Sequence, residues 1–415
     1  MNHLTISLSY LKARAPESLL QVLLLAIGLG TVVFVILFES QFTERMTSNA
    51  KPFDLVVGAK GSALQLVLST VYQADVPTGN IPLPEAQALR EDPGVAVAIP
   101  MALGDSYDGF RIVGTEPDYS AQYGAKLNSG RFWTIPLEAV LGATVAKRSR
   151  LRIGDSFVGI HGVFGGGDEH KDTPYRVVGI LGETGTLIDR LVLTSVESVW
   201  RVHEVQYAHA KSMIFGGSSE ASPEGDGSVG NSLREVTAML IRLKSPASLD
   251  RLEQYVDRRP TLQWASPQQE ATRFLAFVGA GGDMLRVMAG VFIAMSALGV
   301  CTALFNAMRK RRYDFAIMRA LGASPAGLLW LVLVEGVIVA FSAAVIGIML
   351  GHAGAGLIGK LVPEAGAMAL DGSTLAEAEI YIPLLALGAC LLGALLPAVL
   401  AYRIEVAEVL LRRKP

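Results

Sequence analysis

The chain has 415 residues, of which 51% are hydrophobic and only 18% are charged, and its mean hydropathy is +0.40. This charged fraction is below the roughly 25% typical of soluble domains and favours a membrane protein. The formal net charge of −2 gives no indication of a nucleic-acid partner. Cys301 and Cys390 both lie in apolar runs, so the sequence contains neither a disulfide framework nor a CxxC metal motif.

Four apolar runs are long enough to cross a bilayer, whose hydrocarbon core of about 30 Å needs roughly 20 helical residues. These predicted transmembrane helices are residues 19–38, 284–307, 326–350 and 380–402. The first run is longer than the apolar core of a signal peptide and no small-residue cleavage site follows it, so we expect a retained helix. Residues 1–18 carry Leu4, Leu8 and Leu11 on one face and predict a short interfacial elbow helix.

Lysine and arginine residues near the ends of these runs predict the orientation in the membrane, because short cytoplasmic loops carry an excess of both. Basic residues precede the first run, cluster in the loop 309–325 and recur in the tail 403–415, whereas Lys360 is the only one in the loop 351–379. Both termini and the loop 309–325 are therefore expected in the cytoplasm. The loop 351–379 and the long segment 41–280 are expected outside.

The segment 41–280 alternates strand-like and helix-like stretches, which predicts a mixed α/β domain. The expected strands are 54–58, 109–114, 175–181, 190–195 and 238–243, and the expected helices are 84–92, 136–151 and 248–259. Two glycine-rich stretches, 161–175 and 215–232, are expected to be loops. The expected fold class is an α-helical membrane protein with four transmembrane helices plus a large extracytoplasmic mixed α/β domain.

Four of the six histidines lie in this outer segment, and several acidic residues lie close to them in the sequence. Because imidazole and carboxylate groups suit Zn²⁺, these histidines are candidate metal ligands. They are His161, His170, His203 and His209. Their spacing matches no tight motif such as HExxH, so the alternative of solvated loop histidines beside ordinary surface acids stays open.

Motifs of the common enzyme classes are absent from the sequence, which has no GxSxG, no HExxH and no Walker A lysine. The segment GAKGS at 58–62 lacks the spacing with which a phosphate-binding loop wraps its ligand. We therefore expect that the chain is not an enzyme, and that any ATP used with it is hydrolysed by another chain.

The cytoplasmic loop 309–325 carries an amphipathic pattern. Its apolar residues at helical spacing are Tyr313, Ala316, Ile317, Ala320 and Leu321. Gly322 can end this helix, and Ser324 with Pro325 can begin the next one. The pattern predicts a short helix whose apolar face contacts either the lipid headgroups or a partner protein.

The loop sequence RKRRYDFAIMRALGAS resembles the cytoplasmic loop of the FtsX/MacB-type ABC transporter permeases. Three further stretches are similar to the same family: VEGVIVAFSAAVIGIMLG in the third run, LLPAVLAYRIEVAEVL near the end, and EAVLGATVAKRSRLRIGDSF at 138–157. The order of one helix, a large domain and three helices also agrees. The resemblance covers essentially the whole chain.

This resemblance implies that the loop helix is a coupling helix that binds a separate cytoplasmic ABC ATPase. The implied coupling residues are Arg311, Arg312, Tyr313, Asp314, Ile317, Arg319, Leu321 and Gly322. It also implies a dimer with two ATPase copies, which bind ATP and Mg²⁺, and no cofactor on this chain. We expect a homodimer in the lipid bilayer of a bacterial inner membrane, with a periplasmic partner or adaptor protein as a further candidate.

Four residues of the third run match the family's pattern of a glutamate followed by small residues: Glu335, Ser342, Gly347 and Gly351. Gly347 and Gly351 form a GxxxG motif, which is typical of close helix packing. Glu335 lies within the predicted span, where a carboxyl group is costly unless it faces the helix bundle. Either a role in coupling or a helix–helix hydrogen bond would explain it.

These observations predict a permease subunit that couples ATP hydrolysis on a separate ATPase to movement of its extracytoplasmic domain. That movement would drive export, extraction or gating of a periplasmic cargo. The alternative is a membrane-anchored periplasmic sensor or scaffold, or a metal-binding component, that does no ATP-driven work.

Overall fold

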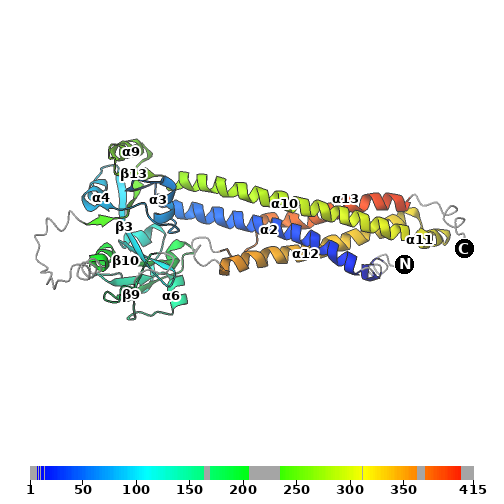
Figure 1. Ribbon diagram of the computed structural model, residues 1–415, viewed down its shortest axis with the longest axis horizontal. Coiled ribbons are helices and arrows are strands. Elements are labelled where there is room, and N and C mark those ends of the chain that lie inside the picture. The colour runs from blue at the N-terminus through cyan, green and yellow to red at the C-terminus, as the bar shows by residue number, and fades with distance from the viewer. Residues whose placement is uncertain are drawn as a thin grey trace, which may run out of the picture. The chain divides into compact units, whose positions relative to one another are not determined.

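Figure 1 shows the computed structural model, which describes residues 7, 9, 11–13, 15–162, 169–204, 234–310, 312–361 and 370–402. The chain divides into two compact units. The helical unit comprises Met1–Phe42, Phe277–Leu361 and Leu370–Pro415, and the sheet unit comprises Thr43–Ala276 and Val362–Ala369. The expected loop 215–232, the tail 403–415, Arg311 and His209 lie outside the described residues.

Among the described residues, four long helices make up most of the helical unit and carry the four predicted apolar runs. They are α2 (Ala15–Ala50), α10 (Pro267–Lys310), α12 (Pro325–Leu361) and α13 (Ile382–Tyr402). Each is long and apolar enough to span a membrane. The short helix α11 (Arg312–Ala320) lies in the loop 309–325, and the 3₁₀ turn η4 (Glu377–Tyr381) precedes α13.

The helices extend beyond the spans that hydropathy marks, because hydropathy detects only the apolar part of a helix. Helix α2 continues past residue 38 to Ala50, and α10 begins at Pro267, before the expected start at residue 284. Both helices therefore reach into the segment 41–280. Residues 7, 9 and 11–13 are helical, at the position of the expected elbow helix.

Glycines allow the backbones of these helices to approach closely. A Cβ atom on Gly347 would lie 2.9 Å from the Cβ of Leu29 and 3.0 Å from the carbonyl oxygen of Ala26, both on α2. A Cβ atom on Gly351 would lie 2.6 Å from the Cβ of Val33. The GxxxG motif therefore lies at the contact between α12 and α2, as expected for helices that pack through small residues in a membrane.

Large apolar side chains remain exposed on all four of these helices. Examples are Leu20 on α2, Leu298 on α10, Phe341 on α12 and Leu392 on α13. The exposure of many large apolar side chains is unfavourable in water and favourable against lipid chains. The surface of the helical unit therefore fits a lipid bilayer.

Polar contacts join the helices near the loop between α12 and α13. The side-chain amide of Gln41 donates to the carbonyl oxygen of Asp371 at 2.9 Å and to the hydroxyl of Thr374 at 2.6 Å. His352 Nε2 lies 2.8 Å from a carboxylate oxygen of Glu379. These contacts hold the loop against α2 and α12. They also replace hydrogen bonds that the same polar groups would otherwise make to water.

A mixed β-sheet of eleven strands forms the body of the sheet unit. The strands of the unit are β1 (Leu55–Ala59), β2 (Ile81–Pro82), β3 (Val95–Tyr107), β4 (Phe110–Thr115), β5 (Leu127–Gly130), β6 (Glu138–Leu141), β7 (Ser156–Phe157), β8 (Ile160–His161), β9 (Tyr175–Leu181), β10 (Val192–Ser195), β11 (Glu235–Val236), β12 (Ala238–Leu243) and β13 (Leu262–Ala265).

The main path of the sheet runs β13-β1-β12-β3-β4-β10-β6-β9-β5, with β7 paired to β9 and β8 paired to β3. Strands β4 and β10 pair in parallel, as do β6 and β9, and the other pairs are antiparallel. Strands β2 and β11 form a separate pair. The expected mixed α/β domain is therefore confirmed.

Helices cover the sheet and divide its apolar interior into two clusters. They are α3 (Ala63–Thr70), α4 (Leu83–Arg90), α5 (Asp118–Gln122), α6 (Ala143–Ser149) and α9 (Leu249–Asp257), with the 3₁₀ turns η1 (Leu187–Arg190) and η2 (Pro246–Ser248) and the helical residues 196–204. One cluster joins β1, β12 and β13 to α4 and α9, and the other joins β4, β6, β9 and β10 to α6. The long strand β3 contributes side chains to both.

One expected element is wrong. The stretch 136–151 was predicted as a single helix, but it forms strand β6, a turn at Gly142 and then α6. Strand β6 is buried between β9 and β10, and burial in a sheet overrides the weak preference of its residues for helix. Gly142 is required at the turn because a Cβ atom there would lie 2.3 Å from the carbonyl oxygen of Ile188.

Replacing a glycine at the contact between α2 and α12 should destabilise the bundle. In Gly351→Ala the new methyl group meets Val33, and overpacking of this kind costs roughly 1–3 kcal/mol. We expect a lower thermal midpoint, measured on the full chain in detergent. Gly354→Ala on the same helix is the matched control, because its nearest neighbour would be 3.7 Å away. Equal midpoints for the two variants would contradict this packing.

Candidate functional site

An irregularity in β3 places Asp105 in the interior of the sheet unit. The register of β3 against β4 shifts between Leu103 and Ser106. The short strand β8 pairs with β3 at the same place, with Asp105 opposite His161. Irregularities in a strand commonly redirect a side chain next to a functional site. Here the residue concerned is an acid whose side chain is only 1% exposed.

Three histidines surround this buried carboxylate. His170 Nε2 lies 3.2 Å, His161 Nδ1 3.4 Å and His203 Nε2 4.0 Å from the same oxygen, Oδ1 of Asp105. The centres of the three imidazole rings are 5.5 to 6.1 Å apart. We call Asp105, His161, His170 and His203 the Asp–His cluster. Asp105 comes from β3 and His161 from β8. His170 comes from the segment between β8 and β9, and His203 from the helical residues 196–204.

Two buried polar atoms at the cluster have no hydrogen-bond partner among the residues that the structure describes. They are Oδ2 of Asp105 and the hydroxyl oxygen of Tyr175. Burial raises the pKa of Tyr175, and the charge of Asp105 acts in the same direction. The phenol therefore stays neutral. A buried carboxylate oxygen without a partner is costly, so such atoms often identify functional positions.

His203 reaches the cluster next to Gly104. A Cβ atom at Gly104 would lie 2.9 Å from Nε2 of His203, so only glycine leaves this ring its space. Burial lowers the pKa of His203; Asp105 opposes this effect, and the neighbouring His161 and His170 add to it. At neutral pH the ring is therefore neutral, which is the form of histidine that binds metal ions.

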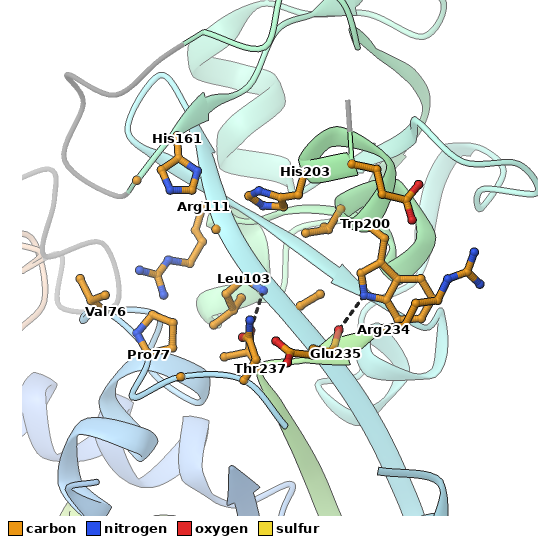
Figure 2. A pocket seen from close by; sticks show the side chains of 17 residues that line it. Val76, Pro77, Leu103, Arg111, His161, Trp200, His203, Arg234, Glu235 and Thr237 are labelled. Atoms are coloured by element: carbon orange, nitrogen blue, oxygen red, sulfur yellow. Dashed lines mark hydrogen bonds between the residues drawn. The ribbon is translucent and has the colours of Figure 1, made fainter. Parts of the chain in front are cut away.

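The cluster borders a pocket of about 720 Å³, which Figure 2 shows. His161 and His203 lie at one end, and Trp200 lies farther along with its indole NH bonded to the carbonyl oxygen of Glu235 at 2.6 Å. Arg111 also lines the pocket and donates to the backbone carbonyls of Ser69 at 3.1 Å and Asp75 at 2.8 Å.

Donor atoms of Asp105, His161 and His203 all lie within 4.8 Å of one another. Two imidazoles and one carboxylate form a set suited to a divalent transition metal. The structure thus brings together three of the four histidines that the sequence suggested. Asp105 was missed. The signal available was an acid at the end of the long apolar run VAVAIPMALGD, because a charge buried next to such a run needs a partner.

The residues expected to couple to an ATPase lie on or beside α11. Ile317 and Leu321 are exposed, by 37% and 83%, and Arg319 is half-buried. Gly322 adopts a left-handed conformation with φ of 97°. For the remaining coupling residues in the described part of the chain only the backbone is described, and it is helical: Arg312, Tyr313 and Asp314.

The residues of the third run lie on α12. Glu335 is buried within the helical unit and Ser342 is half-buried. Gly347 and Gly351 contact α2, as described above.

Comparisons with known proteins relate both parts of the chain to permeases. The family model described as FtsX-like permease C-terminal matches residues 286–406, and the model described as MacB-like periplasmic core domain matches residues 18–259. No curated protein matches.

Two solved structures are similar to part of the chain. The periplasmic region of MacB from Actinobacillus actinomycetemcomitans is 11% identical, with 55% of this chain and 97% of that chain covered and a TM-score of 0.34. The extracellular domain of the noncanonic ABC-type transporter YknZ from Gram-positive bacteria is 12% identical, with 51% and 98% covered and a TM-score of 0.28. The family models, and not these superpositions, support the relationship.

Removing Arg111 should destabilise the sheet unit. Burial lowers the pKa of Arg111 to about 10, so the side chain is charged at neutral pH. In Arg111→Met two backbone carbonyls lose their donors, at a cost of roughly 1–3 kcal/mol. We expect a lower midpoint in thermal unfolding followed by tryptophan fluorescence. Lys147→Met, which removes an exposed ion pair with Glu183, should shift the midpoint far less. An Arg111→Met midpoint no lower than that of Lys147→Met would disprove the expectation.

Proposed function

The chain belongs to the FtsX/MacB family of permeases, as its motifs predicted, and on this basis we propose that it is the permease subunit of an inner-membrane ABC transporter driven by a separate ATPase. The ATPase would bind ATP and Mg²⁺. The observation that carries the proposal is α11, a helix between two membrane-spanning helices at which two large apolar side chains, Ile317 and Leu321, are exposed.

Helix α11 has two faces. Ala316 is fully buried in the helical unit, which fixes the helix against the bundle. Ile317 and Leu321 are exposed and offer an apolar surface to a partner. Exposed apolar side chains beside a basic residue, here Arg319, are typical of a protein contact at the membrane surface.

Backbone hydrogen bonds define the end of α11. The amide of Gly322 donates to the carbonyl of Arg319 at 3.0 Å, and the amide of Ala323 donates to the carbonyl of Met318 at 2.9 Å. This is the Schellman motif, in which the residue after the end of the helix, here Gly322, adopts the left-handed backbone conformation. The hydroxyl of Ser324 then accepts from the amide of Gly327 and caps α12.

The orientation that we propose places α11 and both termini in the cytoplasm and the sheet unit in the periplasm. The excess of Lys and Arg around α11, and the single Lys360 in the loop 351–379, support this orientation. Helices α2 and α10 each include residues of both units. They are the elements through which movement driven by ATP would reach the sheet unit.

The assembly that we propose is a homodimer with two ATPases, because the chain carries one set of four spanning helices among its described residues. Its movement would export, extract or gate a periplasmic cargo, with or without a periplasmic adaptor. A sensor or scaffold without ATP-driven work would leave the exposed face of α11 without a role.

An acidic side chain on α11 should prevent ATPase binding. Burying a leucine or isoleucine contributes about 1.5–3 kcal/mol, so Ile317→Asp and Leu321→Asp should each weaken binding by roughly tenfold or more. Binding of the ATPase to the permease in nanodiscs would be measured by biolayer interferometry.

Leu375→Asp is the matched control for these variants. Leu375 is 81% exposed, but it lies in the loop between α12 and α13, on the opposite side of the membrane in the proposed orientation. It should bind the ATPase like the wild type. If Ile317→Asp and Leu321→Asp also retain wild-type affinity, α11 is not the coupling helix.

A further inference from the structure

The Asp–His cluster has a donor set that hard cations do not favour. Imidazole nitrogen suits Zn²⁺, Cu²⁺, Ni²⁺ and Fe²⁺, whereas Mg²⁺ and Ca²⁺ take oxygen ligands. One buried carboxylate brings a negative charge that compensates part of the charge of a divalent cation. The ligand atoms of the cluster are therefore those that a divalent transition metal prefers, and the negative charge of Asp105 offsets part of the charge of the ion.

The donor atoms of Asp105, His161 and His203 lie within 4.8 Å of one another, which is somewhat wider than the spacing of ligands around a bound ion. Zinc binds imidazole nitrogen and carboxylate oxygen at about 2.0–2.2 Å, so two ligands of a tetrahedral site lie about 3.3–3.5 Å apart. The nitrogen of His161 is 3.4 Å and that of His203 is 4.0 Å from Oδ1 of Asp105. A rotation of the His203 ring, which is 35% exposed, would close the second distance.

Hydrogen bonding alone does not explain the arrangement. A carboxylate has about four lone-pair positions on its two oxygens. Yet all three histidine nitrogens approach Oδ1, and Oδ2 has no partner among the described residues. Imidazoles that served only to satisfy the buried charge would be expected to use both oxygens. The nitrogens of His161 and His203 therefore lie on the same side of the carboxylate as Oδ1, and the three donor atoms are within 4.8 Å of one another, as the ligands of one ion must be.

We propose that Asp105, His161 and His203 bind a divalent transition-metal ion such as Zn²⁺. In this proposal His170 positions the carboxylate of Asp105. His170 is 7% exposed and lies closest to Asp105, at 3.2 Å. Ligands of metal ions are commonly held in this way by a second hydrogen-bonding residue. This inference does not depend on the proposed function, since an ion could bind whether or not an ATPase does.

The pocket gives this site its access and an open coordination position. His161 and His203 line the pocket, whereas Asp105 lies behind them and is buried. Three protein ligands leave one position of a tetrahedral ion available to water or to a donor from another molecule. We therefore infer that the open position faces the pocket of about 720 Å³.

Zinc binding by the full chain in detergent tests the proposal. The protein would be purified without a histidine tag, stripped with chelator and titrated with Zn²⁺ against a chromophoric competitor. The wild type should bind one ion per chain in the presence of excess Mg²⁺. His161→Ala and His203→Ala remove ligands from partly exposed side chains and should abolish this stoichiometric binding.

Two variants test the roles of neighbouring residues without removing a ligand. His170→Gln should weaken binding by roughly 10–100-fold, as is typical when the support of a ligand is lost. Gly104→Ala displaces the ring of His203 and should weaken binding as well. Glu169→Gln is the matched control: it removes an exposed carboxylate next to His170 in the sequence, and binding should be unchanged.

Circular dichroism and thermal midpoints without zinc would confirm that the variants are folded. The proposal is overturned if the wild type binds no more zinc than the His161→Ala/His203→Ala double variant. It is also overturned if Mg²⁺ displaces the ion, or if Glu169→Gln abolishes binding, because either result would indicate an ordinary acidic surface site.

Discussion

The lack of hydrogen-bonding solvent in a bilayer is the constraint on which the helical unit depends. Each backbone amide within the membrane must bond inside its own helix, so the chain crosses as long helices. These helices associate through close packing, and Gly347 and Gly351 provide it at the contact with α2. Polar side-chain contacts such as those of Gln41 on α2 are made with the loop between α12 and α13. Helix α11, at which Ile317 and Leu321 are exposed, is the element that we propose contacts the ATPase.

The sheet unit depends on a different constraint, the cost of burying a charge. Strand β3 crosses both apolar clusters and carries Asp105 between them. A carboxylate at this position needs compensation, and three histidines from separate segments supply nitrogen atoms around it. The same arrangement that stabilises the carboxylate supplies the donor atoms of the metal site that we propose. A bound ion would link β3, β8 and the helical residues 196–204.

Much of this architecture could be predicted from the sequence, because hydropathy and short motifs are local signals. The four apolar runs, the helix ended by Gly322 and the family itself follow from residues close together in the chain. Long-range contacts could not be predicted in this way. Strand β6 was taken for helix because its burial between β9 and β10 depends on distant strands. Asp105 was missed because its partners lie 56 to 98 positions later, and only the fold brings them together.

The central claim is that this chain acts as a permease dimer coupled to a separate ATPase. Native mass spectrometry of the purified chain in nanodiscs, mixed with the candidate ATPase of its own organism, tests that claim most directly. We expect a complex of two permease chains and two ATPases. A permease that remains without ATPase under the same conditions, with α11 intact, would contradict it and would favour a membrane-bound sensor or scaffold.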